Sequence, residues 1–269
     1  MMEGFEGKRV LITGGARGLG LAIARTFARE GAEPILVDLD SEALDEALGG
    51  LRGRAVSARG YVADVTDPTE VEELRDRVHE EAGPVEILVN NAGVVFGGPF
   101  LDVPLERHLA TLRVNTEGLL IVTHTFLSDL IVSREGHLVN IASASGFIGL
   151  PYGSSYAASK WGVIGFSESI RLELEKQGHD RVGVTTVCPS YVDTGMFEGV
   201  EPPKLTRFLE PNEVAEKILS AVTDDDPFVL EPWIVKVTPF LARALPTKIS
   251  DRLSDFFGAT TGMKSWRGH

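Results

Sequence analysis

The sequence predicts an α/β fold in which helices cover both faces of a doubly wound parallel sheet. Short β-rich runs alternate with helical patterns from the first residues onward, and this alternation is typical of parallel strands joined by right-handed crossovers. The runs are apolar along their length, as expected of strands buried on both sides. We expect strands at 8–12, 34–38, 60–64, 86–90, 137–141 and 182–187, with a weaker seventh near 228.

Five segments between these strands carry apolar residues at steps of three and four, which is the helical period. Ser41 is expected to cap one helix, and Gly31, Gly83 and Gly178 to end three others. The expected helices are LGLAIARTFAREG, SEALDEALGG, PTEVEELRDRVHEEAG, a long stretch from Pro104 to about Arg134, and SSYAASKWGVIGFSESIRLELEKQG.

The chain reads as one domain. Its 269 residues contain no linker, repeat or low-complexity tract, and single α/β domains of this size are common. The acidic run 224–226 is expected to be an exposed turn before the last strand. We therefore predict a single domain over 1–269.

Charge and composition narrow the class of partner. The net charge is −13, with 43% hydrophobic and 24% charged residues, which is an ordinary globular composition. A surface of this sign repels nucleic acid and anionic membranes. A small-molecule partner is therefore expected.

Cysteine usage and hydropathy indicate the compartment. A single cysteine, Cys188, excludes an intramolecular disulfide and a CxxC metal site, and it reads as a small buried residue. We see no signal peptide and no apolar run long enough to cross a membrane. The apolar stretch 227–246 is interrupted by Glu231, Lys236, Arg243 and four prolines, so it could touch a membrane but hardly cross one. We expect a cytoplasmic protein.

A glycine-rich loop follows the first predicted strand. In TGGARGLG, Gly14, Gly18 and Gly20 precede a helix, whose free amides and partial positive charge suit a pyrophosphate. A glycine motif alone is weak evidence, because such glycines can simply form a turn. Asp38, about 20 residues further on at the end of the second strand, strengthens the reading, because a carboxylate there binds the hydroxyls of an adenosine ribose.

Asp38 also bears on which dinucleotide binds. A 2′-phosphate would meet this carboxylate at contact distance, and like charges repel. Arg17 in the loop favours the phosphate, but Leu39 and Asp40 supply no second cation. We therefore expect NAD.

Motifs along most of the chain resemble those of the short-chain dehydrogenase/reductase family. They are TGGARGLG at 13–20, Asp64 with Val65, NNAG at 90–93, Asn115, Ser143 in NIASASG, YAASK at 156–160 and CPSYVDT at 188–194. The resemblance implies a seven-stranded Rossmann-type sheet, a nicotinamide cofactor, hydride transfer between an alcohol and a carbonyl, and a homodimer or homotetramer. It assigns dinucleotide binding mainly to 1–140, and catalysis and substrate binding to 141–269.

Tyr156 and Lys160 form the predicted catalytic pair. In a helix, positions i and i+4 share one face. A free phenol, with a pKa of about 10, is too weakly ionised to act as a base near neutrality. The Lys160 ammonium and an oxidised nicotinamide would favour the phenolate. The pair would then take the proton of an alcohol, and by resemblance Lys160 also bonds the nicotinamide ribose.

The resemblance implies supporting roles for three further polar residues. Ser143 would donate a hydrogen bond to the reacting oxygen; Ser145 is its rival and is expected to line the pocket. Asn115 would hold a water that passes protons from Lys160, although it could also simply satisfy backbone groups. None of the six histidines has metal-ligand spacing, so no metal is expected.

Other residues are expected to surround the cofactor. Ser190 stands where a glycine commonly follows the proline in this family, which leaves the local turn open. Asp64 and Val65 would face the adenine, the NAG segment would wall the groove, and the loop after the sixth strand would hold the carboxamide. Besides the loop glycines, Asp38, Tyr156 and Lys160, the predicted cofactor contacts are Arg17, Leu19, Asp64, Val65, Asn91, Ala92, Gly93, Pro189, Val192 and Thr194.

The predicted substrate pocket is apolar. Such a lining binds by burying apolar area and offers no partner for a phosphate or carboxylate. The segments CPSYVDTGMFEGV and GMKSWRGH also look like the branch that handles retinol, steroids and long-chain alcohols. A bulky hydrophobic alcohol is expected; alternatively, the apolar residues pack on 227–257 and leave room only for short alcohols. The lining residues are Val94, Val95, Phe96, Ser145, Phe147, Ile148, Pro151, Tyr152, Tyr191, Met196 and Phe197.

Two other functions compete with an NAD-dependent alcohol dehydrogenase. Arg17 alone supports an NADP-dependent carbonyl reductase. A dinucleotide-binding regulator without catalysis is disfavoured, because such relatives normally lose the tyrosine or the lysine, and both are present here.

Overall fold

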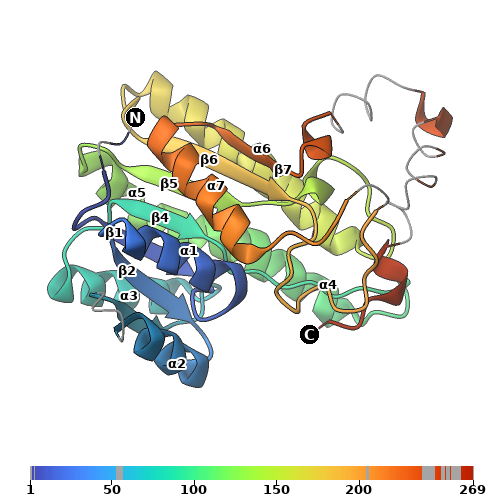
Figure 1. Cartoon of the computed structure of the whole chain (residues 1–269), viewed down its shortest axis with the longest axis horizontal. Coiled ribbons are helices and arrows are strands. Elements are labelled where there is room, and N and C mark those ends of the chain that lie inside the picture. The colour runs from blue at the N-terminus through green and yellow to red at the C-terminus, as the bar shows by residue number, and fades with distance from the viewer. Residues whose placement is uncertain are drawn as a thin grey trace.

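The computed structural model contains a seven-stranded, all-parallel sheet in the order β3-β2-β1-β4-β5-β6-β7 (Figure 1). The structure describes residues 2, 4–52, 57–203, 206–237, 246–249, 252, 255 and 262–268. The strands are β1 (Arg9–Thr13), β2 (Glu33–Asp38), β3 (Arg59–Val62), β4 (Ile87–Asn90), β5 (His137–Ile141), β6 (Gly183–Pro189) and β7 (Phe228–Glu231).

Helices pack on both faces of the sheet, as predicted. The main helices are α1 (Gly18–Arg29), α2 (Ser41–Arg52), α3 (Pro68–Glu81), α4 (Leu105–Leu112), α5 (Leu119–Val132), α6 (Ser154–Lys176) and α7 (Pro211–Asp224). Residues of α1, α2 and α7 share one apolar cluster, and residues of α3, α5 and α6 share another on the opposite face. Short 3₁₀ turns lie at Ala144–Gly146 and Gly262–Ser265.

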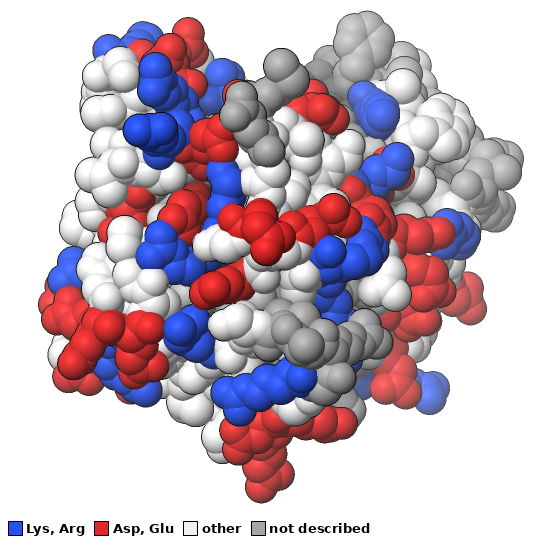
Figure 2. All heavy atoms as spheres, turned by 60° about the vertical axis from the view of Figure 1, so that its left-hand side comes forward, with Lys and Arg blue, Asp and Glu red and all other residues white. Residues whose placement is uncertain are grey.

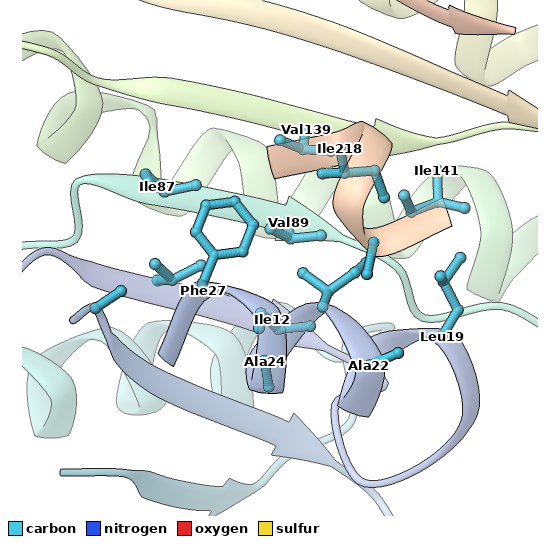
Figure 3. Close-up of a cluster of buried hydrophobic side chains, with 14 of the residues drawn as sticks. Ile12, Leu19, Ala22, Ala24, Phe27, Ile87, Val89, Val139, Ile141 and Ile218 are labelled. Carbon is cyan, nitrogen blue, oxygen red and sulfur yellow. The ribbon is translucent and has the colours of Figure 1, made fainter. Parts of the chain in front are cut away.

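One face of the core is built where α1 and α7 lie side by side (Figure 1). Figure 3 shows Phe27 of α1 and Ile218 of α7 against Ile87 and Val89 of β4 and Val139 of β5. All five side chains are fully buried. Each contributes about 1.5–3 kcal/mol of burial free energy, so this cluster holds α1 and α7 against one face of the sheet.

The predicted strands are all present, with ends shifted by one or two residues. The long predicted helix 104–134 is three elements, because a π-helical turn at Arg113–Gly118 separates α4 from α5. The sequence analysis did not predict the helix α7. Ser41 is the first residue of α2 rather than its cap, since Asp40 Oδ1 accepts the Ala43 backbone N–H at 3.0 Å.

The glycine stops and the acidic turn are where the sequence placed them. Gly31, Gly83 and Gly178 follow helices with φ of 89°, 93° and 80°, a conformation that favours glycine. The run 224–226 is exposed, and Asp225 ends α7 in the left-handed region at φ 58°. Of the apolar stretch 227–246, residues 238–245 lie outside the described residues, as does His269.

The order of the strands sets the position of the site. The chain runs outward from β1 to β3 and then returns to β4 on the other side of β1. In open α/β sheets, ligands bind beyond the carboxyl ends of the strands at such a switch point. We therefore expect the loops after β1, β4, β5 and β6 to surround the ligand site.

Acidic and basic side chains are interspersed over the face drawn in Figure 2, with no continuous basic stripe there. Among the described residues, no helix is long and apolar enough to span a bilayer. The exclusion of nucleic acid, which the net charge of −13 suggests, stays a prediction.

His137, at the start of β5, links stability to pH. It is buried, and its Nε2 lies 2.8 Å from Thr185 Oγ1, which donates to the Asp226 carbonyl. Nε2 therefore carries the proton of a neutral ring. Burial lowers the pKa of His137 from 6.5 to about 3.

We predict that His137→Gln flattens the acid limb of the stability curve. Below pH 6.5 the unfolded histidine takes up a proton that the native residue refuses, so stability falls towards about pH 3, with a limiting slope of about 1.4 kcal/mol per pH unit. Denaturant unfolding from pH 7 to pH 4 measures this slope. The exposed His124, replaced by Gln, is the control; equal slopes in wild type and His137→Gln would contradict the assignment.

Candidate active site

Tyr156 and Lys160 share one buried face of α6. Tyr156 is 6% exposed and Lys160 is 4% exposed, and Lys160 Nζ lies 5.7 Å from the centroid of the Tyr156 ring. The ammonium donates to the Ile141 carbonyl at 2.7 Å, at the end of β5. The structure thus brings the predicted pair together at the carboxyl edge of the sheet.

Burial dominates the electrostatics of this pair. It raises the pKa of Tyr156 above its ordinary value, and the hydrogen bond with Ser143 opposes that shift only in part. Burial also lowers the pKa of Lys160 to about 8, so the lysine is still largely charged at neutral pH. The sequence led us to expect a phenol pKa lowered by Lys160; in the structure, desolvation of the phenolate sets the direction instead, and the pKa is raised.

Ser143 lies at the end of β5 next to Tyr156. Its backbone is extended, and its Oγ accepts the Ser145 backbone N–H at 3.2 Å. Ser145 Oγ is buried with no hydrogen-bond partner among the described residues. Cys188 is also buried beside this group, and burial raises the pKa of its thiol to about 12, in keeping with a small packing residue rather than a nucleophile.

Asn115 lies in the π-helical turn between α4 and α5. Its Oδ1 accepts the Val94 N–H at 2.8 Å, and its Nδ2 donates to the Val94 carbonyl at 2.9 Å and to Ser159 Oγ at 3.0 Å. Ser159 Oγ in turn donates to the Tyr156 carbonyl at 2.7 Å. Both amide protons are therefore in use, and the side chain ties the loop after β4 to the helix of Tyr156. Single π turns of this kind often occur at functional sites.

The glycine loop leaves a close-fitting cradle in front of α1. Gly14 and Gly18 have φ of 61° and 53°, and Asn91 Nδ2 donates to the Gly14 carbonyl at 2.9 Å. A Cβ on Gly20 would lie 2.1 Å from that carbonyl oxygen. Arg17, at the N-cap of α1, is extended and makes no side-chain cap, so the first amides of α1 are free for a ligand.

The walls of this groove come from the loops after β4 and β6. Thr194, after β6, lies over the loop, since a Cβ on Gly18 would be 3.1 Å from its Cβ. Thr194 N–H bonds the Val192 carbonyl at 3.0 Å. Ala92 backs Gly14, with its Cα 3.0 Å from a Cβ built there, and a Cβ on Gly93 would lie 3.2 Å from Asn115 Oδ1. The residues present fit a dinucleotide.

Asp38 and its neighbours define the outer end of the groove. Asp38 Oδ2 accepts the Ala16 N–H at 3.1 Å, and Oδ1 accepts the Asp40 N–H at 3.2 Å. The Arg17 guanidinium forms an ion pair with the Asp40 carboxylate, which sequence spacing did not reveal. One Asp64 oxygen is engaged by the backbone and hydroxyl of Thr66.

Ser190 does not disturb the turn after β6. Its φ is not in the left-handed region, where among the described non-glycine residues only Tyr152 and Asp225 lie. Its backbone N–H donates to the Glu231 carbonyl at 2.8 Å. Serine is therefore compatible with the backbone that Pro189 begins.

Five of the eleven predicted pocket residues belong to one apolar cluster around the phenol: Val95, Tyr152, Tyr191, Met196 and Phe197. Tyr191 and Phe197 pack edge to face at 5.1 Å, and Phe197 packs on the Tyr156 ring at 5.9 Å. Burial raises the pKa of Tyr191 to about 12, so it is a poor base. The members are Val95, Leu150, Tyr156, Ala157, Tyr191, Phe197, Val200 and Met263, with Tyr152, Met196, Phe208 and Trp266 at the margin.

Phe147 does not join this cluster. It packs with Val163, Ile164 and Cys188 on the other side of the 3₁₀ turn. Met263 and Trp266 do join it, although sequence reasoning gave the chain end no contact with the site. No local periodicity could have placed them there.

His108 is a second residue that sequence reasoning set aside. It is buried on α4; its Nε2 lies 3.0 Å from the Phe100 carbonyl and its Nδ1 3.0 Å from Ser155 Oγ. The imidazole therefore joins the loop after β4 to the residue before Tyr156. Among the described residues, no cluster of three or more histidine, cysteine or acidic side chains could hold a metal.

Comparisons with known proteins show the family of this chain. A family model described as short chain dehydrogenase matches residues 8–204. Epidermal retinol dehydrogenase 2 of Mus musculus is 37% identical over 255 residues, covering 94% of this chain and 82% of that protein. Retinol dehydrogenase 10 of Homo sapiens is 32% identical over 282 residues, covering 94% and 83%.

Two solved structures are similar over most of their length. A short-chain dehydrogenase/reductase of Burkholderia phymatum in complex with NAD superposes with a TM-score of 0.83 at 27% identity, covering 90% of this chain and 95% of that one. Actinorhodin polyketide ketoreductase with NADPH gives 0.74 at 33% identity, covering 80% and 90%. The two neighbours contain different dinucleotides.

We predict that Gly20→Ala weakens dinucleotide binding at least tenfold, because the new methyl group meets the Gly14 carbonyl and overpacking of this kind costs about 1–3 kcal/mol. Gly49→Ala is the matched control: it lies in α2 with nothing within 4 Å and should stabilise by about 0.5–1 kcal/mol. Calorimetric titration with NAD and NADP measures the effect. Unchanged affinity in Gly20→Ala would rule out this loop as the binding cradle.

Proposed function

We propose, from the premise that this chain belongs to the short-chain dehydrogenase family, that it is an NAD-dependent oxidoreductase interconverting a hydrophobic alcohol and its carbonyl. One observation carries the proposal. Tyr156 and Lys160 share a buried helix face next to Ser143, between the glycine cradle and an apolar cluster. Such an arrangement can remove a hydroxyl proton where hydride leaves the adjacent carbon.

The roles of the chain's own residues follow from their positions. The Tyr156 phenolate would take the alcohol proton and become the phenol, and Ser143 would donate a hydrogen bond to the reacting oxygen. A bound nicotinamide supplies the hydride acceptor and, when oxidised, a positive charge near the phenol. Lys160 is still largely protonated at neutral pH, because its pKa is about 8, and it adds the second positive charge that offsets the burial of a phenolate.

Asn115 ties the site together through its side-chain amide. Its amide joins Val94 to Ser159 and so fixes the loop after β4 against the helix of Tyr156. Only a lone pair on Oδ1 is left for a water. We keep the proton-relay role as a proposal in which that water donates to Asn115.

A hydrophobic substrate is supported by the lining and by the relatives. The described members of the cluster around Tyr156 carry no charged group, so a phosphate or carboxylate would lose its hydration without a partner. The relatives at 32–37% identity include proteins named retinol dehydrogenases. We propose a bulky alcohol as substrate, with short alcohols as the alternative.

Two assignments about the whole chain remain proposals. We assign 1–140 mainly to the dinucleotide and 141–269 to catalysis and substrate, which agrees with the cradle in the first part and Tyr156 in the second. We also propose a reducing compartment, the cytoplasm, on the strength of the lone buried Cys188.

We predict that Tyr156→Phe lowers kcat for alcohol oxidation by about 10²–10⁴-fold or more, because the ring still packs on Phe197 but exchanges no proton. NADH binding, measured by fluorescence titration, should change little. Tyr191→Phe is the matched control, a neighbouring phenol in the same cluster, and should retain most of its activity. Substantial turnover by Tyr156→Phe would point to another base.

We predict higher kcat/KM with NAD than with NADP. Asp38→Asn should raise KM for NAD by about tenfold, the loss expected of a hydrogen bond to a charged group. Asp40→Ala is the informative partner variant: it frees Arg17 from its ion pair and should improve NADP use while leaving NAD use intact. The alternative is an NADP-dependent carbonyl reductase, because one structural neighbour contains NADPH. A wild-type preference for NADP would contradict our proposal and favour this alternative.

We also propose a homo-oligomer that pairs through α4, α5 and α6. Exposed apolar side chains lie on all three helices: Leu105, Leu109 and Leu112 on α4, Leu120 on α5, and Trp161 and Leu172 on α6. Light scattering at micromolar concentration should give a multiple of 29.1 kDa. Leu109→Glu should lower the mass, and Val62→Glu on the edge strand β3 should not; a monomeric wild type would refute the pairing.

A further inference from the structure

The C-terminal strap, residues 262–268, is inserted into the wall of the catalytic pocket. Met263 is 1% exposed and packs in the cluster of Val95, Tyr156 and Tyr191. Trp266 packs at the margin of the same cluster. A segment more than a hundred residues from Tyr156 in sequence therefore shields the reacting phenol.

Two glycines make the socket that Met263 fills. A Cβ on Gly97, in the loop after β4, would lie 3.0 Å from Met263 Cε and 3.0 Å from Trp266 Cβ. A Cβ on Gly153, just before α6, would lie 3.7 Å from the same Cε. These loops flank Tyr156, so the Met263 side chain occupies the space between them.

The strap is hydrogen-bonded to residues 196–199, the lid loop, which carries Phe197. The Arg267 N–H donates to the Glu198 carbonyl at 2.8 Å, and Trp266 Nε1 donates to the Met196 carbonyl at 3.0 Å. A Cβ on Gly199 would lie 2.4 Å from the Ser265 carbonyl oxygen. Phe197, between these contacts, covers the Tyr156 ring. Strap and lid loop therefore form one unit.

This packing conflicts with binding a bulky substrate in place. Tyr156 is only 6% exposed, and apolar side chains already fill the space beside it. Methionine is unbranched and flexible, and an apolar ligand replaces its contacts at low cost. An apolar substrate body of similar width would fit the socket between Gly97 and Gly153.

We propose that Met263 and Trp266 determine specificity: the strap is the movable wall of the substrate site, and the apolar body of a large alcohol takes the place of the Met263 side chain. The proposal rests on the proposed alcohol dehydrogenase function. It adds that size selection resides in the chain end, which moves together with residues 196–199, so that the side-chain volume at position 263 sets the ratio of large to small alcohols oxidised.

The kinetic test compares isopropanol with decanol in three variants of the full chain. Met263→Trp should lower kcat/KM for decanol relative to that for isopropanol by about tenfold or more, since one misfit in an apolar pocket has effects of this order. Met263→Ala should shift selectivity towards larger alcohols, and Met263→Leu should restore the wild-type ratio. Equal effects of Met263→Trp on both alcohols would overturn the proposal.

A binding readout separates movement of the strap from turnover. Trp161→Phe and Trp233→Phe leave Trp266 as the only tryptophan of the three. In this background, with Tyr156→Phe to prevent reaction and NAD present, decanol should shift the Trp266 emission saturably and isopropanol should not. Unchanged emission at saturating decanol would show a fixed wall and refute the inference.

The two experiments also separate failure of this inference from failure of the proposed alcohol dehydrogenase function. If wild type oxidises neither alcohol with either dinucleotide, the proposed function fails. If it oxidises both and the decanol-to-isopropanol ratio ignores residue 263, only the inference fails. A ratio that follows side-chain volume at 263 supports both.

Discussion

Desolvation of Tyr156 and Lys160 is the constraint on which the rest of the site depends. The helix α6 buries both against the carboxyl edge of β5, which raises the pKa of the phenol and lowers that of the lysine to about 8. Each shift favours the neutral form. Positive charge beside the phenol offsets this cost, and we propose that an oxidised nicotinamide would supply it together with Lys160.

The scaffold supplies that coupling by converging loops on one point. The switch in strand order places the glycine cradle after β1 beside the NAG segment after β4. Asn115 then bonds the loop after β4 to the helix turn that carries Tyr156. One amide therefore fixes the proposed dinucleotide groove relative to the helix that carries Tyr156.

Local patterns predicted what local forces determine. Strand positions followed from apolar runs, and the i, i+4 pair followed from helix geometry. The helix α7 was missed although Pro211 and the apolar spacing of Val214, Ile218 and Val222 mark it. The π turn at Asn115, the outward packing of Phe147 and the insertion of Met263 depend on distant contacts, for which sequence spacing carries no signal.

The central claim is that hydride moves directly between an alcohol carbon and a nicotinamide beside Tyr156. The most direct test incubates the enzyme with NAD and decanol deuterated at the carbinol carbon, and weighs the reduced dinucleotide by mass spectrometry. The account predicts a reduced nicotinamide that is one mass unit heavier than with ordinary decanol, together with decanal. Oxidation that leaves the deuterium in water, or no reduced dinucleotide from decanol or any other alcohol, would contradict it.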